Sequence, residues 1–174
     1  MTQRACSLWL MPTGTVYQEL SQLISRLAKE NSSIEFQPHI TLIGNVEAQE
    51  EKMIMKTREV ASLLRPCPVK LVDIGYTDYY YRALYLNVNP SPEVLIAYQV
   101  ARKIFFGDSD TSYMPHLSLL YGDFSIEVKK QITSKIGNNF TNEFEANTLY
   151  LYLTEGIAND WQEIGAFPLQ NVGS

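Results

Sequence analysis

The sequence has little of what several protein classes require. Its two cysteines, Cys6 and Cys67, are too few for a disulfide framework or for a zinc site with four thiolate ligands. No apolar run approaches the roughly eighteen residues that cross a bilayer, and the N-terminus does not read as a secretory signal. Glycine-rich phosphate loops and the GxSxG nucleophile motif are also missing. We therefore expect a cytoplasmic protein with no membrane segment.

Positive charge is scarce as well. The chain has 14 Lys and Arg against 19 Asp and Glu, which gives a net charge of -5. A protein that grips long nucleic acid needs a basic surface to displace the counterions of the phosphates. We therefore expect no long nucleic acid as a partner, whereas a small anionic ligand is compatible with positive charge placed locally.

Apolar residues are plentiful enough for one core. The chain has 174 residues, of which 45% are hydrophobic and 11% aromatic. A single core grows comfortably at this size, and this much apolar surface offsets the ordering entropy of folding. We predict one domain over residues 1–174 and expect it to be a monomer.

The most informative feature is an internal repeat. The segment PHITLI at 38–43 returns as PHLSLL at 115–120, 77 residues later. At nearly the same spacing, SLWL at 7–10 matches ALYL at 83–86. Two halves, at about 5–76 and 82–153, therefore share one plan.

Periodicity predicts the same order of elements in both halves. We expect an α+β fold of two lobes related by a pseudo-two-fold axis, each with an antiparallel sheet and helices, and a site in the cleft between the sheets. Ser91, Pro92 and Gly107 are typical of the two ends of one helix. The expected strands are 5–10, 35–43, 69–76, 82–88, 115–121, 144–153 and 161–167, and the expected helices are 15–29, 49–64, 92–106 and 125–136.

The repeat carries both histidines of the chain, each preceded by proline and followed two places later by a hydroxyl residue. Residues two apart in a strand point the same way, so His39 lies beside Thr41 and His116 beside Ser118. An imidazole titrates near neutrality, so one of a pair can accept a proton while the other donates one. Two hydroxyl groups can hold the oxygens of a tetrahedral anion. This set indicates acid–base chemistry on a phosphodiester.

Two other interpretations of the histidines remain. A histidine on a strand is often a packed core residue, but packing alone gives no reason to repeat proline, histidine and hydroxyl together. Two histidines with no carboxylate at ligand spacing supply at most half of a tetrahedral zinc shell. We therefore expect no metal and no cofactor.

These motifs resemble the 2H phosphoesterase superfamily. Within it, the segments 7–12 and 113–121 and the strand with Trp161 are similar to the plant and fungal cyclic phosphodiesterases. The resemblance implies a bilobal LigT-like domain that opens small cyclic phosphates without metal. Its substrates would be nucleoside 2′,3′-cyclic phosphates, opened to 2′-phosphates, and ADP-ribose 1″,2″-cyclic phosphate, opened to the 1″-phosphate. It implies His116 as general base, His39 as general acid, and Thr41 and Ser118 as phosphoryl ligands.

The same resemblance suggests Trp9, Tyr81 and Tyr121 as substrate-binding aromatics, on which a base can stack. Strict alternation points Tyr121 away from His116, so its use requires the strand to twist, bulge or end there. The polar segment 107–113 is a candidate mobile cover of the cleft, or an ordinary surface loop.

Two alternative functions are kept open. One is a 2H enzyme that processes RNA ends or 2′,5′ linkages, although the acidic balance of the chain argues against an RNA groove. The other is a nucleotide-binding module without catalysis, which would have little use for two matched imidazoles.

Overall fold

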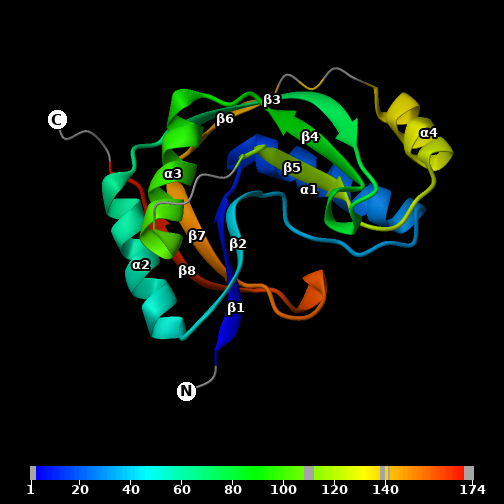
Figure 1. Ribbon diagram of the computed structural model, residues 1–174. Helices are drawn as coiled ribbons and strands as arrows, with labels where there is room; N and C mark the ends of the chain where they lie inside the picture. The colour runs from blue at the N-terminus through cyan, green and yellow to red at the C-terminus, as the bar shows by residue number, and fades with distance from the viewer. Residues whose placement is uncertain (1–2, 108–111, 138–139, 141, 171–174) are drawn as a thin grey trace.

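The computed structural model describes residues 3–107, 112–137, 140 and 142–170, and Figure 1 shows their arrangement. Within these residues it has four α-helices and eight strands, a mixed α/β fold. The helices are α1 (Gly14–Glu30), α2 (Glu50–Leu63), α3 (Pro92–Phe106) and α4 (Ile126–Ile136). The strands are β1 (Arg4–Leu10), β2 (Ile40–Ala48), β3 (Cys67–Tyr76), β4 (Leu84–Val88), β5 (His116–Leu120), β6 (Glu143–Ala146), β7 (Thr148–Leu153) and β8 (Gln162–Pro168).

The strands form one curled antiparallel sheet in the order β6-β3-β4-β5-β2-β1-β7-β8. We expected two separate sheets, and the difference lies at the centre, where β2 pairs with β5 through the register pair Ile40 and Leu117. This pairing joins the two half-sheets, each of which contains strands from both halves of the chain, because β3 pairs with β4 and β7 pairs with β1. The pseudo-two-fold relation between the halves stays a prediction.

Helix α3 begins and ends where its sequence signals predict. The hydroxyl of Ser91 accepts a hydrogen bond from the backbone N–H of Val94 at 3.3 Å, and Pro92 is the first helical residue. Gly107 follows the helix with φ of 79°, a left-handed conformation that glycine adopts without steric cost. The helix is thereby fixed at both ends.

Two predicted strands differ from the structure. The expected strand 144–153 is two strands, because β6 pairs with β3 whereas β7 pairs with β1 and β8, and the chain changes neighbours at Asn147. Strand β2 begins at Ile40 and continues to Ala48, past the expected end at Ile43. Within it Asn45 has φ of 56°, a left-handed conformation that asparagine tolerates.

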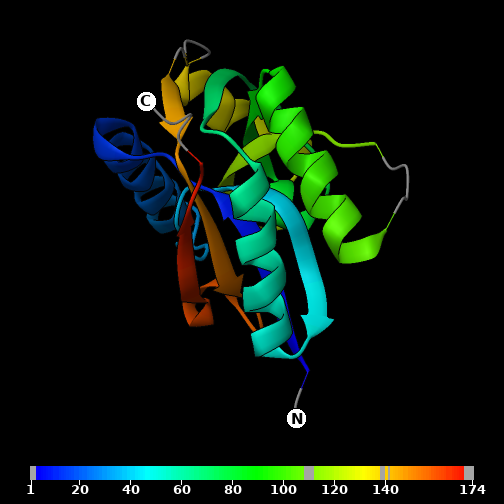
Figure 2. The same ribbon diagram turned by 90° about the vertical axis from the view of Figure 1, so that its left-hand side faces the viewer.

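Helices α2 and α3 pack against each other on one face of the sheet (Figures 1 and 2). Helix α2 contacts β7 and β8, and α3 contacts β2 and β3, so the pair bridges the two halves of the sheet. None of the helices among the described residues is long and apolar enough to span a membrane. The candidate cover at 107–113 falls largely outside the described residues.

Candidate active site

The two histidines lie at the centre of the sheet, at the starts of neighbouring strands. His39 directly precedes β2 and His116 begins β5. Because Ile40 pairs with Leu117 in antiparallel register, the residues on either side point to the opposite face. Thr41 and Ser118 share that face, and all four motif residues line one cavity of about 420 Å³. The structure thus brings together the four residues that the repeat singled out.

Both imidazole rings are held in the same way. Nδ1 of His39 lies 2.6 Å from the carbonyl oxygen of Gln37, and Nδ1 of His116 lies 3.0 Å from that of Met114. A carbonyl oxygen only accepts, so Nδ1 carries the proton in each ring. Nε2 is therefore the nitrogen that gains or loses a proton, and in each ring it is left for a ligand.

Burial makes both rings poor proton binders in the free protein. The side chain of His39 is only 7% exposed, and its loss of solvent lowers the pKa from 6.5 to about 4. Burial also lowers the pKa of His116, against the raising effect of the Met114 carbonyl. The positive charge of Arg82 adds to the lowering at His116. Neutral imidazoles therefore predominate at pH 7.

The two motif hydroxyls differ in their present partners. Ser118 Oγ donates a hydrogen bond to the carbonyl oxygen of Tyr81 at 2.8 Å. The Thr41 hydroxyl has no hydrogen-bond partner among the described residues, while the backbone carbonyl of Thr41 accepts from Tyr113 Oη at 3.0 Å. Thr41 therefore offers a free donor to the cavity, whereas Ser118 connects β5 to the Tyr81 backbone.

Trp9 lines the cavity, but both faces of its ring are covered. His39 stacks on one face with a centroid distance of 3.7 Å, and Tyr152 stacks on the other at 4.1 Å. The second repeat has an equivalent contact, in which Tyr85 meets His116 at 5.5 Å in an edge arrangement. The indole of Trp9 has no free face on which a nucleobase can stack.

Tyr81 and Tyr121 line the same cavity. Strand β5 ends at Leu120, which frees Tyr121 from the alternation that would point it away. Tyr121 stacks on Phe36 with centroids 3.7 Å apart and is 3% exposed, whereas Tyr81 is 43% exposed. The ring centroid of Trp161 lies 6.4 Å from that of Tyr81 and 6.2 Å from that of Tyr121. These rings form an aromatic wall in which Tyr81 is the most accessible.

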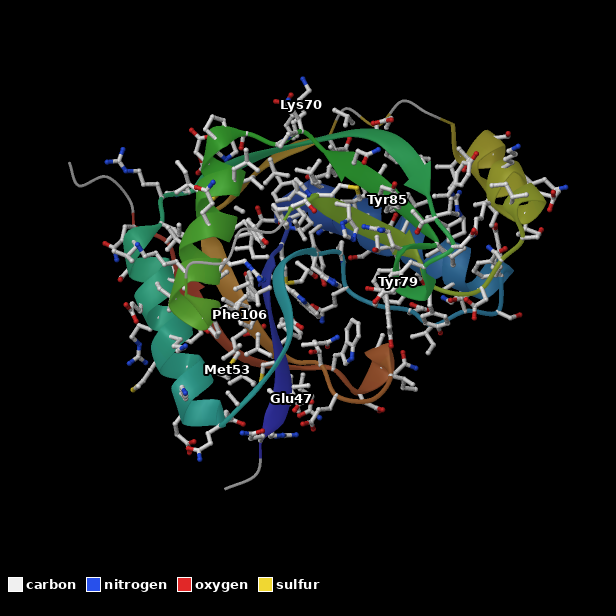
Figure 3. The ribbon with its side chains drawn as sticks, viewed as in Figure 1. Glu47, Met53, Lys70, Tyr79, Tyr85 and Phe106 are labelled. Carbon is white, nitrogen blue, oxygen red and sulfur yellow. The ribbon has the colours of Figure 1, made fainter. Side chains whose placement is uncertain are left out.

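Arg82 and Trp161 were not among the predicted site residues, yet both line the cavity. The sequence held a signal for Arg82, which is a lone basic residue directly after the run Tyr79, Tyr80 and Tyr81. Its guanidinium group lies close to the rings of Tyr79 and Tyr85, both of which are labelled in Figure 3. No described residue that lines the cavity is an aspartate or glutamate, so its charge balance favours an anion.

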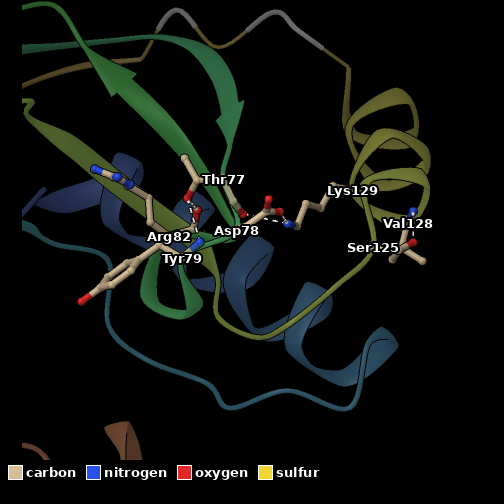
Figure 4. A network of polar contacts seen from close by, with 7 residues as sticks. All are labelled: Thr77, Asp78, Tyr79, Arg82, Ser125, Val128 and Lys129. Atoms are coloured by element: carbon tan, nitrogen blue, oxygen red, sulfur yellow. Dashed lines mark hydrogen bonds and ion pairs between the residues drawn. The ribbon is translucent and has the colours of Figure 1, made fainter.

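A buried lysine holds the turn between β3 and β4. Lys129 of α4 is 1% exposed and its Nζ donates to the carbonyl oxygen of Thr77 and to Asp78 Oδ1, both at 2.7 Å (Figure 4). Thr77 Oγ1 donates in turn to the carbonyl oxygen of Arg82 at 2.7 Å. This network fixes the segment that carries Tyr79, Tyr81 and Arg82. No periodicity signal pointed to Lys129.

Within the part of the chain that the structure describes, no group of three or more His, Cys, Asp or Glu side chains is placed to hold a metal ion. The cavity instead presents two imidazoles, hydroxyl groups and a guanidinium. Each of these groups can hydrogen bond to a phosphoryl oxygen.

Comparisons with known proteins identify two relatives of this chain. The chain is 28% identical to the cyclic phosphodiesterase of Arabidopsis thaliana over 131 residues, which is 74% of this chain and 71% of the plant protein. It is 26% identical to the 2′,3′-cyclic-nucleotide 3′-phosphodiesterase of Yarrowia lipolytica over 161 residues, 84% of this chain and 72% of that protein.

Solved structures share the fold. E. coli LigT in its apo form superposes with a TM-score of 0.70 at 14% identity, over 98% of this chain and 100% of LigT. The protein TT0787 of Thermus thermophilus has the same TM-score and identity, over 97% of this chain and 100% of its own. The sequence model of cyclic phosphodiesterase-like proteins matches residues 4–171. The chain therefore belongs to the cyclic phosphodiesterase-like family of 2H phosphoesterases.

Proposed function

We propose that the protein hydrolyses small cyclic phosphodiesters by two-histidine acid–base catalysis and without a metal. The proposed substrates are nucleoside 2′,3′-cyclic phosphates, opened to 2′-phosphates, and ADP-ribose 1″,2″-cyclic phosphate, opened to the 1″-phosphate. The name of the Yarrowia relative specifies the 3′ bond of a 2′,3′-cyclic nucleotide. Breaking that bond leaves the phosphate on the 2′ oxygen.

One observation carries the proposal. His39 and His116 are held by the same backbone bond to Nδ1, and both line one cavity. Opening a cyclic phosphate requires a proton to leave the attacking water and another to reach the departing oxygen. Two imidazoles that each present Nε2 to one ligand supply both transfers.

The family resemblance assigns the two roles. Nε2 of His116 accepts a proton from water as the new P–O bond forms, and Nε2–H of His39 protonates the ribose oxygen as the old P–O bond breaks. His39 must therefore be protonated when the substrate is bound. Its pKa is about 4 in the free protein, and a phosphate anion beside the ring favours the imidazolium. Binding of the anionic substrate then raises the pKa of His39, and the ring takes up from solvent the proton that the acid step uses.

Thr41 is the proposed first hydroxyl donor to the phosphoryl group, because its side chain is free. Ser118 takes part when its hydroxyl turns from the Tyr81 carbonyl to the phosphate. Tyr81 and Tyr121 are the proposed base contacts, Tyr81 because of its exposure. Trp9 supports His39 in this scheme, since its two faces are occupied.

We also infer that the two halves of the chain arose by duplication and are related by a pseudo-two-fold axis between β2 and β5. When β1 is matched with β4, β2 with β5 and β3 with β7, the order β3-β4-β5-β2-β1-β7 reads the same from both ends. Trp9 pairs with Thr41 as Tyr85 pairs with Ser118, which supports the match. The site then lies between two equivalent half-sheets.

Product analysis tests the proposed reaction. We expect adenosine 2′,3′-cyclic phosphate to give adenosine 2′-phosphate in excess chelator, with ¹⁸O from labelled water on phosphorus. Predominant 3′-phosphate would overturn the assigned orientation of the ribose. Dependence on an added divalent ion would overturn the metal-free mechanism. Nucleotide binding without turnover would favour the binding module.

A further inference from the structure

Arg82 enters the cavity from a firmly held turn. It ends the short 3₁₀ helix Tyr80–Arg82, where its N–H donates to the carbonyl oxygen of Tyr79 at 2.9 Å. Its guanidinium carbon lies 6.0 Å from the ring centroid of Tyr79 and 5.7 Å from that of Tyr85. The backbone of Arg82 is thus fixed, and its charged end lies near two aromatic rings.

The guanidinium lacks the partner that a partly buried charge normally has. Its Nε is buried and makes no hydrogen bond among the described residues. The carboxylate of the same turn, Asp78, is bound by Lys129, and Figure 4 shows Arg82 pointing to the other side. No described residue that lines the cavity carries a compensating negative charge. An anionic ligand in the cavity would supply the negative charge that the guanidinium lacks.

The charge on Arg82 also matters for the histidine beside it. Arg82 and His116 line the same cavity, and Tyr85 contacts both, in an edge arrangement with His116. His116 lies near the Met114 carbonyl, Tyr85, Arg82 and the other imidazole, His39, and the charge of Arg82 favours its neutral form. A neutral His116 is the form that accepts a proton from water.

We propose that Arg82 binds the non-bridging phosphoryl oxygens of the substrate and stabilises the negative charge that builds up on them in the transition state. This inference rests on the proposed function. When water attacks a cyclic phosphodiester, the charge on these oxygens grows from one towards two. The two Nη groups of a guanidinium form a fork that matches two phosphate oxygens. The Thr41 hydroxyl contributes a neutral donor to the same group.

The test compares Arg82→Gln and Arg82→Lys with the wild type and with Arg58→Gln, which removes an exposed arginine of α2. The measurements are kcat/KM on adenosine 2′,3′-cyclic phosphate and affinity for adenosine 2′-phosphate. We expect a loss of about 100-fold in kcat/KM for Arg82→Gln, in the range for a lost transition-state donor. Arg82→Lys keeps the charge without the fork, so its loss is smaller. Arg58→Gln matches the wild type.

The pH profile distinguishes this role from a structural one. Loss of the Arg82 charge raises the pKa of His116, so the alkaline limb of kcat/KM moves to higher pH in Arg82→Gln and stays in place in Arg82→Lys. An Arg82→Gln variant with near wild-type kcat/KM and an unshifted profile overturns the proposal. If the wild type proves inactive, equal affinity of wild type and Arg82→Gln for adenosine 2′-phosphate still refutes the role of Arg82. A weakened affinity supports it independently of turnover.

Discussion

The indole of Trp9 lies flat on the imidazole of His39, with ring centroids 3.7 Å apart and planes 14° from parallel. Tyr152 covers the opposite face of the indole, so three rings form one stack that ends at the cavity. Trp9 is 2% exposed and His39 is 7% exposed. The stack therefore fixes the orientation of His39 and removes water from one face of its ring.

Removing the indole is expected to change the titration of His39. In Trp9→Ala water reaches the ring, so the pKa of His39 rises from about 4 towards 6.5. The cavity left by the indole also costs about 3 to 5 kcal/mol of unfolding free energy. Titration of the imidazole protons by NMR, with denaturant unfolding, measures both effects. Trp9→Phe keeps an aromatic face and gives smaller changes; an unchanged His39 pKa in Trp9→Ala would refute the role of the stack.

The buried histidine also makes stability depend on pH. The folded-state pKa of His39 lies below its unfolded value, so the unfolded chain binds the extra proton between pH 6.5 and about 4. The unfolding free energy therefore falls as the pH drops through this window. The contribution of His39 is about 3 kcal/mol. Urea unfolding of wild type and His39→Gln at pH 7 and pH 4.5 measures this contribution. The unfolding free energy should fall less in the variant between the two pH values, because the variant lacks the imidazole. Equal losses in both proteins would contradict the assignment.

Activity should show an acidic optimum in kcat/KM. Catalysis requires one neutral and one protonated imidazole, and in the free protein the pKa of both rings lies below 6.5. The singly protonated pair is therefore depleted as the pH rises above 6.5. We expect a bell-shaped profile whose two apparent pKa values both lie below 6.5 and belong to the pair. The profile of kcat should lie at higher pH, because the bound anion favours protonation. An alkaline limb of kcat/KM centred above pH 7 would be inconsistent with the buried histidines.

Two simple rules predicted that the four motif residues lie together, and in the structure they line one cavity. Alternation in a strand placed His39 beside Thr41 and His116 beside Ser118, and the repeat indicated that both pairs belong to one site. Tyr121 departed from alternation, and the structure shows the reason, since β5 ends at Leu120. The prediction of two separate sheets was wrong, because the pairing of β2 with β5 depends on contacts between residues far apart in the sequence.

The surroundings of individual side chains could also not be predicted from the sequence. An aromatic residue on a strand can face a ligand or lie in the core. The segment SLWL alone does not indicate that both faces of the Trp9 ring are covered by other rings. Lys129 was hidden for a similar reason. It lies on the buried side of α4 beside Ile132, where a helical pattern predicts an apolar residue. Only the tertiary structure shows that its Nζ reaches the carbonyl of Thr77.

Lys129 provides a test of the turn that carries the cavity wall. Lys129→Met removes both hydrogen bonds to the turn and leaves the Thr77 carbonyl without this donor, at a cost of about 1 to 3 kcal/mol. We expect KM to rise severalfold while the His39 titration is unchanged, because the turn carries Tyr81 and Arg82 but not His39. Lys130→Met, an exposed neighbour on the same helix, is the matched control. Equal KM values for Lys129→Met and Lys130→Met would show that the turn has no role in substrate binding.

In the proposed mechanism, two imidazoles share the proton transfers of one phosphodiester hydrolysis. This mechanism is tested most directly by the rate of adenosine 2′,3′-cyclic phosphate hydrolysis in excess chelator for wild type, His39→Ala and His116→Ala. We expect turnover by the wild type and a loss of at least about 100-fold in each variant, the range typical of general acid–base groups. Activity near that of the wild type in either variant would contradict it.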